Sequence, residues 1–166
     1  MEIRKATLDD YDIIYDLAQR TWYATYTEIL SQEQVEYMLD MMYSRKAIAG
    51  QMDVKGHQFL LIEDKGNAIG FASYELGYKP ATAKLHKLYV LPNIQGKGAG
   101  RLLMAEVEKV ALQNGNSKVV LNINRYNRAF DFYSKCGYTK IGEEDIDIGR
   151  GYLMEDYIMA KELKSL

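Results

Sequence analysis

A glycine-rich turn between an apolar strand and a helix constrains the fold more than any other part of this sequence. Apolar side chains alternate along residues 85–91 in a way typical of a strand, and Pro92 ends the run. Residues 95–101 then read Gln-Gly-Lys-Gly-Ala-Gly-Arg, and a helix is predicted to begin near Gly100. Glycines let the backbone bend towards a ligand, and a new helix adds unpaired amides and the positive end of its dipole. With Lys97 and Arg101 adding positive charge, the turn is expected to bind a phosphate or pyrophosphate.

Two other glycine-rich loops are excluded by their spacing. A Walker loop requires Gly-x-x-x-x-Gly-Lys-Ser/Thr, and no such run is present. A dinucleotide fingerprint requires Gly-x-Gly-x-x-Gly and an acidic residue about 20 positions further on. Residues 116–120 read Asn-Ser-Lys-Val-Val and contain no acid. The pattern that fits is Gln-x-x-Gly-x-Gly, formed by Gln95, Gly98 and Gly100.

A second informative segment covers residues 121–138. A strand ends there in a polar turn that contains asparagines, and Asn127 is predicted to cap a helix. That helix has the pattern Ala-x-x-Phe-Tyr-x-x-x-Gly-Tyr, and Gly137 ends it. Its apolar face is formed by Ala129, Phe132, Tyr133 and Cys136.

Together, the two segments resemble the signatures of the GCN5-related N-acetyltransferase (GNAT) superfamily, the first of them its coenzyme A-binding motif. The order of elements from Ile3 to Leu163 is similar as well. The resemblance implies a single-domain α/β fold over residues 1–166, with a mixed, mostly antiparallel twisted sheet of six to seven strands and helices on both faces. Within the superfamily, the N-terminal half and residues 156–163 are similar to the PaiA-type polyamine N-acetyltransferases.

The other elements follow from capping signals and periodicity. A helix is expected after Thr7 and Asp10, and another after Ser31 and Gln34, with the aromatic run 21–26 between them. The turn at 65–67 predicts a hairpin. Further helices are expected over 44–54 and 100–114, and strands over 3–6, 58–64, 68–78, 118–123, 138–141 and 152–162.

Composition limits the partners. The 166 residues carry a net charge of −2, which gives no basic field for nucleic acid. The charge is unevenly placed, since residues 1–44 hold three Lys/Arg against nine Asp/Glu, and residues 143–156 hold one against six. Residues 84–101 hold four Lys/Arg and no acid. A basic centre between acidic ends suits an anionic cofactor that meets a cationic substrate.

The numbers of cysteines and histidines and the hydropathy pattern exclude disulfide-linked, metal-binding and membrane-spanning classes of protein. Cys136 is the only cysteine, so no internal disulfide forms, and it is interpreted as a packing residue. His57 and His86 are too few and too far apart in the sequence to indicate a metal site. Because no apolar run approaches about 20 residues and no signal-peptide core is present, a cytoplasmic protein without membrane association is expected. The sequence is compatible with a homodimer.

The resemblance implies which residues bind acetyl-coenzyme A. In this fold the strand before the loop splays from its neighbour, and its backbone pairs with the pantetheine arm, which places this role on Leu88, Tyr89 and Val90. The resemblance of the second segment implies that Asn122 and Asn127 also bind the cofactor. Tyr133 matches the superfamily tyrosine that protonates the departing sulfur, so it is the predicted general acid. The turn amides that would hold the pyrophosphate belong to Gln95, Gly96, Lys97, Gly98, Ala99, Gly100, Arg101 and Leu102.

The general base and the acceptor pocket are less sharply indicated. Strict alternation would place Lys84, His86, Leu88 and Val90 on one face of their strand, with His86 as a candidate base and Glu75 as the alternative. In this fold the acceptor lies near the first two helices and the C-terminal hairpin. Aromatic side chains and carboxylates there would suit a cation. The candidate acceptor residues are Trp22, Tyr23, Tyr26 and Glu28, with the acids of 143–147 opposite.

The expected reaction is transfer of an acetyl group from acetyl-coenzyme A to a primary amine of a small molecule, by direct attack in a ternary complex. A polyamine or another small cationic amine is the expected acceptor. The alternatives are acetylation of a protein N-terminus or ribosomal protein, which would need a groove for an extended peptide, and a coenzyme A-binding sensor without turnover.

Overall fold

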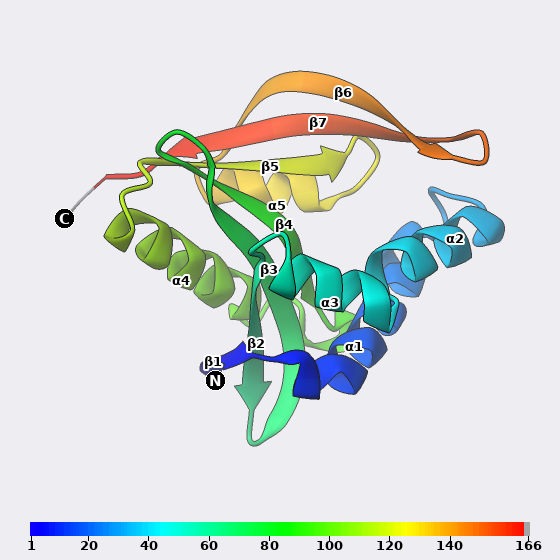
Figure 1. The fold of residues 1–166 in the computed structure, drawn as a ribbon, viewed down its shortest axis with the longest axis horizontal. Coiled ribbons are helices and arrows are strands. Elements are labelled where there is room, and N and C mark those ends of the chain that lie inside the picture. The colour runs from blue at the N-terminus through cyan, green and yellow to red at the C-terminus, as the bar shows by residue number, and fades with distance from the viewer. Residues whose placement is uncertain (165–166) are drawn as a thin grey trace.

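The structure, a computed structural model, describes residues 1–164, and one seven-stranded sheet runs through them (Figure 1). The strand order is β1-β2-β3-β4-β5-β7-β6. Only β4 and β5 pair in parallel among these strands; the other pairs are antiparallel. The expected mixed, mostly antiparallel sheet is confirmed. The strands are β1 (Glu2–Ala6), β2 (Gln58–Asp64), β3 (Asn67–Lys79), β4 (Thr82–Val90), β5 (Lys118–Asn124), β6 (Thr139–Gly149) and β7 (Tyr152–Glu162).

Helices cover both faces of the sheet, as expected (Figure 1). On one face lie α1 (Tyr11–Tyr26), α2 (Gln32–Tyr43) and α3 (Arg45–Asp53). On the other face lie α4 (Ala99–Gln113) and α5 (Ala129–Lys135). Short 3-10 helices cover Leu8–Asp10 and Pro92–Ile94. No helix within residues 1–164 is long and apolar enough to cross a membrane.

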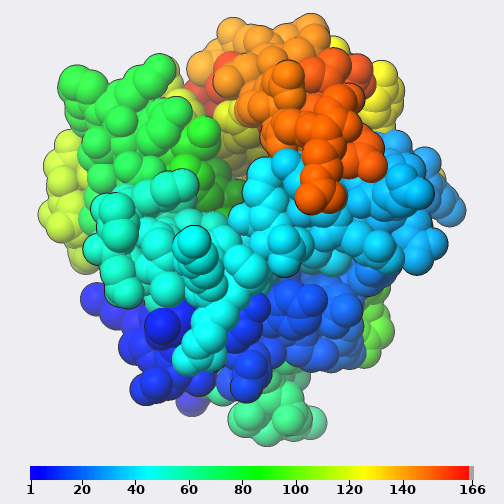
Figure 2. Space-filling view, turned by 45° about the vertical axis from the view of Figure 1, so that its right-hand side comes forward, coloured from blue at the N-terminus to red at the C-terminus, as the bar shows by residue number. Residues whose placement is uncertain are grey.

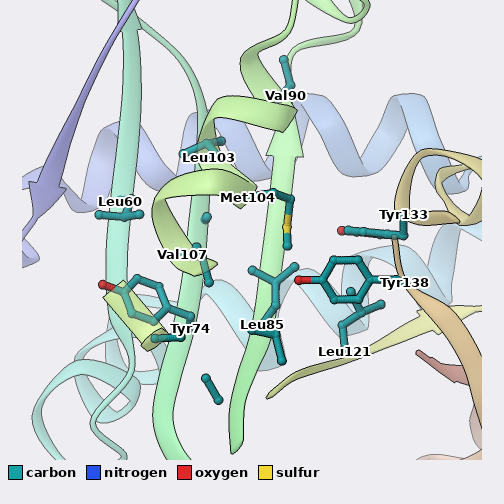
Figure 3. Close-up of a cluster of buried hydrophobic side chains, with 14 of the residues drawn as sticks. Leu60, Tyr74, Leu85, Val90, Leu103, Met104, Val107, Leu121, Tyr133 and Tyr138 are labelled. Atoms are coloured by element: carbon teal, nitrogen blue, oxygen red, sulfur yellow. The ribbon is translucent and has the colours of Figure 1, made fainter. Parts of the chain in front are cut away.

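Alternation along the strands divides the core into two clusters. On β2, Leu60 and Ile62 pack on the α4 side, while Phe59 and Leu61 pack on the α1–α3 side. Figure 3 shows the first cluster, in which Leu103 and other side chains of α4 lie over the strands. Complete burial of a leucine contributes roughly 1.5–3 kcal/mol. The sheet is therefore fixed from both sides, and its strands can position a site.

The predicted helix starts agree with the structure. Thr7 and Asp10 form a capping box, with the Thr7 amide donating to Asp10 Oδ2 over 3.0 Å. The Ser31 hydroxyl accepts from the Gln34 amide over 3.1 Å. The Gln34 side chain does not complete a second box; its amide donates to the Leu153 carbonyl of β7 over 3.3 Å. Helix α2 is thus tied to the C-terminal hairpin.

Two sequence-based expectations about element bounds are wrong. The aromatic run 21–26 does not separate two helices, because α1 continues through Tyr26. β6 extends from Thr139 to Gly149 rather than ending near residue 141. It lies at the edge of the sheet and is mostly exposed, so its acidic residues face water and its strand signal is weak.

β4 contains a bulge that changes which way its side chains point. Ser73 pairs with Lys87 and the next residue, Tyr74, pairs with Leu85, so His86 has no partner in β3. Leu88 and Val90 pack into the cluster beneath α4, whereas His86 and Lys87 contact residues on the α1–α3 side. The shared face expected for Lys84, His86, Leu88 and Val90 is therefore wrong, because an extra residue shifts the alternation.

Candidate active site

A cavity of about 1110 Å³ opens where β4 and β5 separate. The two strands pair only from Thr82 with Lys118 to Leu85 with Leu121, and then diverge. The cavity reaches the glycine-rich turn at one end, and α1, α2 and the β6–β7 hairpin at the other. One continuous space therefore joins the predicted cofactor and acceptor regions.

The hairpin closes the acceptor end of this cavity against α2. The Tyr37 hydroxyl donates to the Ile148 carbonyl over 2.6 Å, and the rings of Tyr37 and Tyr152 lie 5.6 Å apart. Figure 2 shows the tip of the hairpin, in orange, resting on α2, in light blue. Ile148 and Met154 of the hairpin line the cavity. The acceptor end is accordingly a covered pocket at this side.

The glycine-rich turn has the backbone geometry that an anion site needs. Gly98 is the N-cap residue of α4 and has φ = +89°, a conformation that side chains disfavour. The Gln95 side-chain amide donates to the Val90 carbonyl over 3.1 Å and holds the turn against the end of β4. Gly100 is already helical, and a Cβ there would lie 3.0 Å from Phe132 Cζ, so its glycine permits α4 and α5 to approach.

The turn fits the pyrophosphate of coenzyme A through its backbone. Helix α4 begins there, so its first amides have no partners within the helix. Lys97 and Arg101 are exposed beside the cavity, and so is Leu102. The cavity itself reaches Gln95, Gly96, Ala99 and Gly100.

The splayed part of β4 also fits a pantetheine arm. Leu88, Tyr89 and Val90 line the cavity beyond the last β4–β5 pair, so their backbone is not bonded to β5. On the opposite edge, Tyr89 and Val90 pair with β3. A rigid strand with one open edge can form ladder-like hydrogen bonds to the amides of an extended ligand.

Tyr133 of α5 lies at the junction of core and cavity. Its side chain packs in the cluster beneath α4 and also lines the cavity. Figure 3 shows its ring extending from α5 towards β4. Burial raises the pKa of its hydroxyl well above the ordinary value, so Tyr133 is protonated at neutral pH. A protonated phenol can donate, which is the state that a general acid requires.

The two asparagines predicted to bind the cofactor have different surroundings. Asn127 Oδ1 accepts from the Ala129 amide over 2.9 Å at the start of α5, and its Nδ2 donates to the Tyr26 hydroxyl over 3.3 Å. Asn122 lines the cavity, but its side-chain amide is turned to Glu144 and Asp156 of the hairpin. The structure thus places the side chain of Asn122 towards the acceptor end.

Three of the four predicted acceptor residues line the cavity: Trp22, Tyr26 and Glu28. Trp22 is fully buried, donates to the Tyr43 hydroxyl over 3.2 Å and packs 4.5 Å from the Tyr26 ring, so it mainly supports the wall. Tyr23 lines a separate surface depression instead. The reason is that residues 21–26 are helical, so Tyr23 points about 100° away from Trp22 around α1.

His86 and Glu75, the two predicted bases, are hydrogen-bonded to each other and form one cluster with His57, whose Nε2 lies 3.4 Å from Glu75 Oε1. His86 Nε2 lies 2.9 Å from Glu75 Oε1, and the rings of His57 and His86 stack at 3.9 Å. Burial, with nearby lysines, lowers the pKa of His86 to about 3. Burial first, and then His86, lowers the pKa of His57 to about 4. Both rings are therefore neutral at physiological pH. Of the two predicted bases, only His86 lines the cavity.

The two histidines, which are far apart in the sequence, lie side by side in the structure, next to Glu75. Ligand atoms of His57, Glu75 and His86 lie within 4.8 Å of one another. The ring planes are only 15° from parallel, however, so their in-plane lone pairs do not converge on one point. Zinc requires nitrogen ligands directed at it from roughly 2.0–2.1 Å. The arrangement is that of stacked imidazoles sharing a carboxylate.

Two buried charged residues that line the cavity were not singled out from the sequence. Lys87 is 5% exposed, and its ammonium donates to Gln51 Oε1 over 2.8 Å; burial lowers its pKa to about 7. Asp156 of β7 is 4% exposed. Lys87 follows His86 and Asp156 follows Glu155 in the sequence, so neither stands out as a single charge in an apolar strand. Only the bulge and the strand pairing turn their side chains into the cavity.

Comparison with known proteins agrees with this geometry. Residues 26–154 match the acetyltransferase (GNAT) domain family. The spermidine N(1)-acetyltransferase of Thermoplasma acidophilum is 32% identical over 161 residues, covering 93% of this chain and 96% of that protein. The uncharacterized N-acetyltransferase YuaI of Bacillus subtilis is 26% identical over 92% of this chain and 88% of its own.

Two solved structures of N-acetyltransferases have a similar fold. The PaiA N-acetyltransferase of Thermoplasma acidophilum, in complex with coenzyme A, superimposes with a TM-score of 0.80 at 29% identity, covering 97% of this chain and 98% of that one. A GCN5-related N-acetyltransferase from Rhodopseudomonas palustris shares the fold with a TM-score of 0.82 at 22% identity, covering 98% and 95% of the two chains.

The fold, with its splayed strands and glycine-rich turn at the start of α4, defines a coenzyme A-dependent acyltransferase. The chain belongs to the GNAT superfamily and is an N-acetyltransferase that uses acetyl-coenzyme A.

Proposed function

We propose that the protein acetylates a primary amine of a small cationic molecule, with polyamines such as spermidine as the acceptor class. The observation that carries this proposal is the covered acceptor pocket, whose walls combine aromatic and methionine side chains with carboxylates. Carboxylates attract a cation, and aromatic faces and apolar side chains accommodate methylene groups. The similarity to a spermidine N(1)-acetyltransferase supports the same acceptor class.

The covered pocket weighs against a peptide substrate. A protein N-terminus would enter as an extended chain and needs an open groove. Here Tyr37, Ile148 and Leu153 bridge α2 and the hairpin at the acceptor end. A small flexible amine fits such a pocket without separating these elements. The location of Tyr133 and His86 on the cavity wall weighs against a sensor without turnover.

The proposed roles of the residues follow from their positions. Bound acetyl-coenzyme A supplies a thioester, which an amine can attack directly. The amides of 95–102 bind the pyrophosphate, and the open edge of β4 orients the pantetheine arm. The Val90 amide, at the end of that edge, donates to the thioester oxygen as negative charge develops on it. Tyr133 donates its phenolic proton to the departing sulfur.

For proton removal from the acceptor, His86 is the better placed of the two candidates, because it lines the cavity while Glu75 does not. Glu75 instead receives a hydrogen bond from the His86 ring and fixes its orientation. Since the pKa of His86 is lowered to about 3, this ring is a weak proton acceptor at neutral pH. Efficient turnover would thus depend mainly on orientation and on the thioester's own reactivity.

The test is an acceptor panel with acetyl-coenzyme A, in which release of the coenzyme A thiol is followed for polyamines, amino acids, aminoglycosides and an N-terminal peptide. Spermidine or another polyamine should give the highest kcat/KM. A clear preference for the peptide or for a neutral amine would contradict the proposed acceptor class.

A further inference from the structure

The side chain of Asp156 has a buried carboxylate oxygen that lacks a partner. Oδ2 accepts a hydrogen bond from Asn122 Nδ2 over 3.2 Å. Oδ1 is buried and has no hydrogen-bond partner among residues 1–164. A carboxylate can accept several hydrogen bonds, and leaving a buried charged oxygen unbonded is costly. Because Asp156 lines the cavity, a bound ligand is in a position to supply the missing donor.

Glu144 provides a second carboxylate next to Asp156. The two residues pair directly across β6 and β7, so their side chains leave the same face of the sheet. The same Asn122 amide that donates to Asp156 also lies 3.3 Å from Glu144 Oε2. One neutral amide thus serves two carboxylates, and the pair keeps an excess of negative charge.

The nearby cations of the described residues are engaged elsewhere. Arg125 pairs with Asp145 and lies 4.0 Å from Glu143. The Lys84 ammonium lies 4.7 Å above the Tyr78 ring. Within residues 1–164 neither forms an ion pair with Asp156. Burial raises the pKa of Asp156 and Glu144 adds to the effect, while the Asn122 hydrogen bond and the more distant Lys84 and Arg125 oppose it; a bound cation would act in the same direction as these two.

The surroundings of this acidic pair indicate what kind of cation would fit. The cavity wall near the hairpin and α2 is apolar, with Met38, Ile148 and Met154. Tyr26 lies close enough to Asp156 for the carboxylate to help raise the pKa of its hydroxyl, after the larger effect of burial. An alkyl chain ending in an ammonium matches this wall, whereas a hydrated metal ion would not use it.

We propose that Asp156 and Glu144 bind a second, non-reacting ammonium group of the acceptor, and that they select amines carrying two or more positive charges. This inference rests on the proposed function. The reacting nitrogen must lose its proton before it attacks, and an ionised carboxylate would keep it protonated. The acidic pair therefore suits the other end of the molecule, while the Asn122 amide holds both carboxylates in place.

The experiment compares two acceptors of equal length, hexamethylenediamine and hexylamine, which differ only in the second ammonium. With saturating acetyl-coenzyme A, the wild-type protein should prefer the diamine in kcat/KM by about tenfold or more. Asp156→Asn keeps the shape and should remove most of that preference by raising KM for the diamine about tenfold, equivalent to about 1.4 kcal/mol. KM for hexylamine should change little.

Glu144→Gln should reduce the preference a few-fold, since Glu144 is more exposed than Asp156. Glu155→Gln is the matched control: it removes the same charge one residue away on β7, where the side chain leaves the other face. Its selectivity should equal that of the wild type. If Asp156→Asn fails to fold, the proposal is still tested by the ratio of kcat/KM for the diamine to kcat/KM for hexylamine, measured in the wild type and in Glu144→Gln.

The possible failures are distinguishable. Equal KM values for diamine and monoamine in the wild type, or an unchanged ratio in folded Asp156→Asn, would overturn the acidic pair as a binding site and leave amine acetylation standing. Absence of turnover with every small amine would overturn the proposed function itself, and with it this inference.

Discussion

The two ends of the cavity are formed by different groups, backbone atoms at the cofactor end and side chains at the acceptor end. At the cofactor end, one segment, residues 88–102, supplies an open strand edge and a glycine-rich helix start, and both act through backbone groups. At the acceptor end, side chains from α1, α2, β5, β6 and β7 meet across large distances in the sequence. Backbone recognition constrains mainly the glycines, whereas side-chain recognition changes with every substitution. The first end is therefore suited to a fixed ligand and the second to a variable one.

A charged residue in the glycine turn should break the cofactor end and give the largest effect. Gly98→Asp places a carboxylate at the helix N-cap, beside the expected pyrophosphate, so coenzyme A affinity should fall by about 100-fold or more, roughly 2.7 kcal/mol. Gly98→Asn is the control, since asparagine has a similar size and tolerates a positive φ. Calorimetry showing equal affinities for the two variants would contradict an electrostatic role for the turn.

Tyr133 sits between the two ends, and its substitution should affect turnover without affecting binding. Tyr133→Phe removes the proton donor but keeps the ring in the core, so kcat should fall by about 100-fold, the low end of the range for general acid catalysis, because a thiolate already leaves readily. Coenzyme A affinity, measured by calorimetry, should remain near that of the wild type. A variant with wild-type kcat would show that Tyr133 serves packing alone.

Lys87 offers a smaller, pH-dependent effect at the acceptor side of β4. The pKa of Lys87, about 7 in the folded protein, is below that of an unfolded lysine, so the unfolded chain binds more protons between about pH 7 and 10.5. The destabilisation caused by burying Lys87 is therefore complete below about pH 7 and decreases as the pH rises through that window. Lys87→Met should consequently raise the melting temperature by a few degrees more at pH 6 than at pH 9.

The nearby groups that bear on this measurement are Lys55, which also lowers the pKa of Lys87, and Gln51, which loses its donor in the variant. Gln51 loses an ammonium donor at pH 6 and a neutral amine donor at pH 9, so this loss is larger at pH 6 and acts against the expected difference. A pH-independent change in melting temperature would mean that Lys87 is not a buried, partly neutral amine.

Local chemistry explains which expectations were confirmed. The caps at Thr7 and Ser31, the hairpin at 65–67 and the helix after Gly98 each depend on residues within a few positions of one another. Such features are encoded by side-chain hydrogen bonds to nearby amides and by glycine's access to positive φ. They can be predicted without the rest of the chain.

The errors have a common cause as well. The helical phase of Tyr23, the bulge at His86 and the length of β6 each depend on packing or pairing with distant segments. Alternation misassigned β4 because one inserted residue reverses every later side chain. The stacking of His57 on His86 followed from the same bulge, and no spacing in the sequence signals it.

By itself the sequence determined the family, the α/β architecture and the turn for the cofactor, because a strand, a glycine turn and a helix start are adjacent in the chain. Only the tertiary structure decided how the acceptor end is built. Asp156 and Glu144 become neighbours through the pairing of β6 with β7, and Asn122 joins them through the pairing of β5 with β7. Specificity there depends on register between strands, which long-range packing sets and local sequence does not.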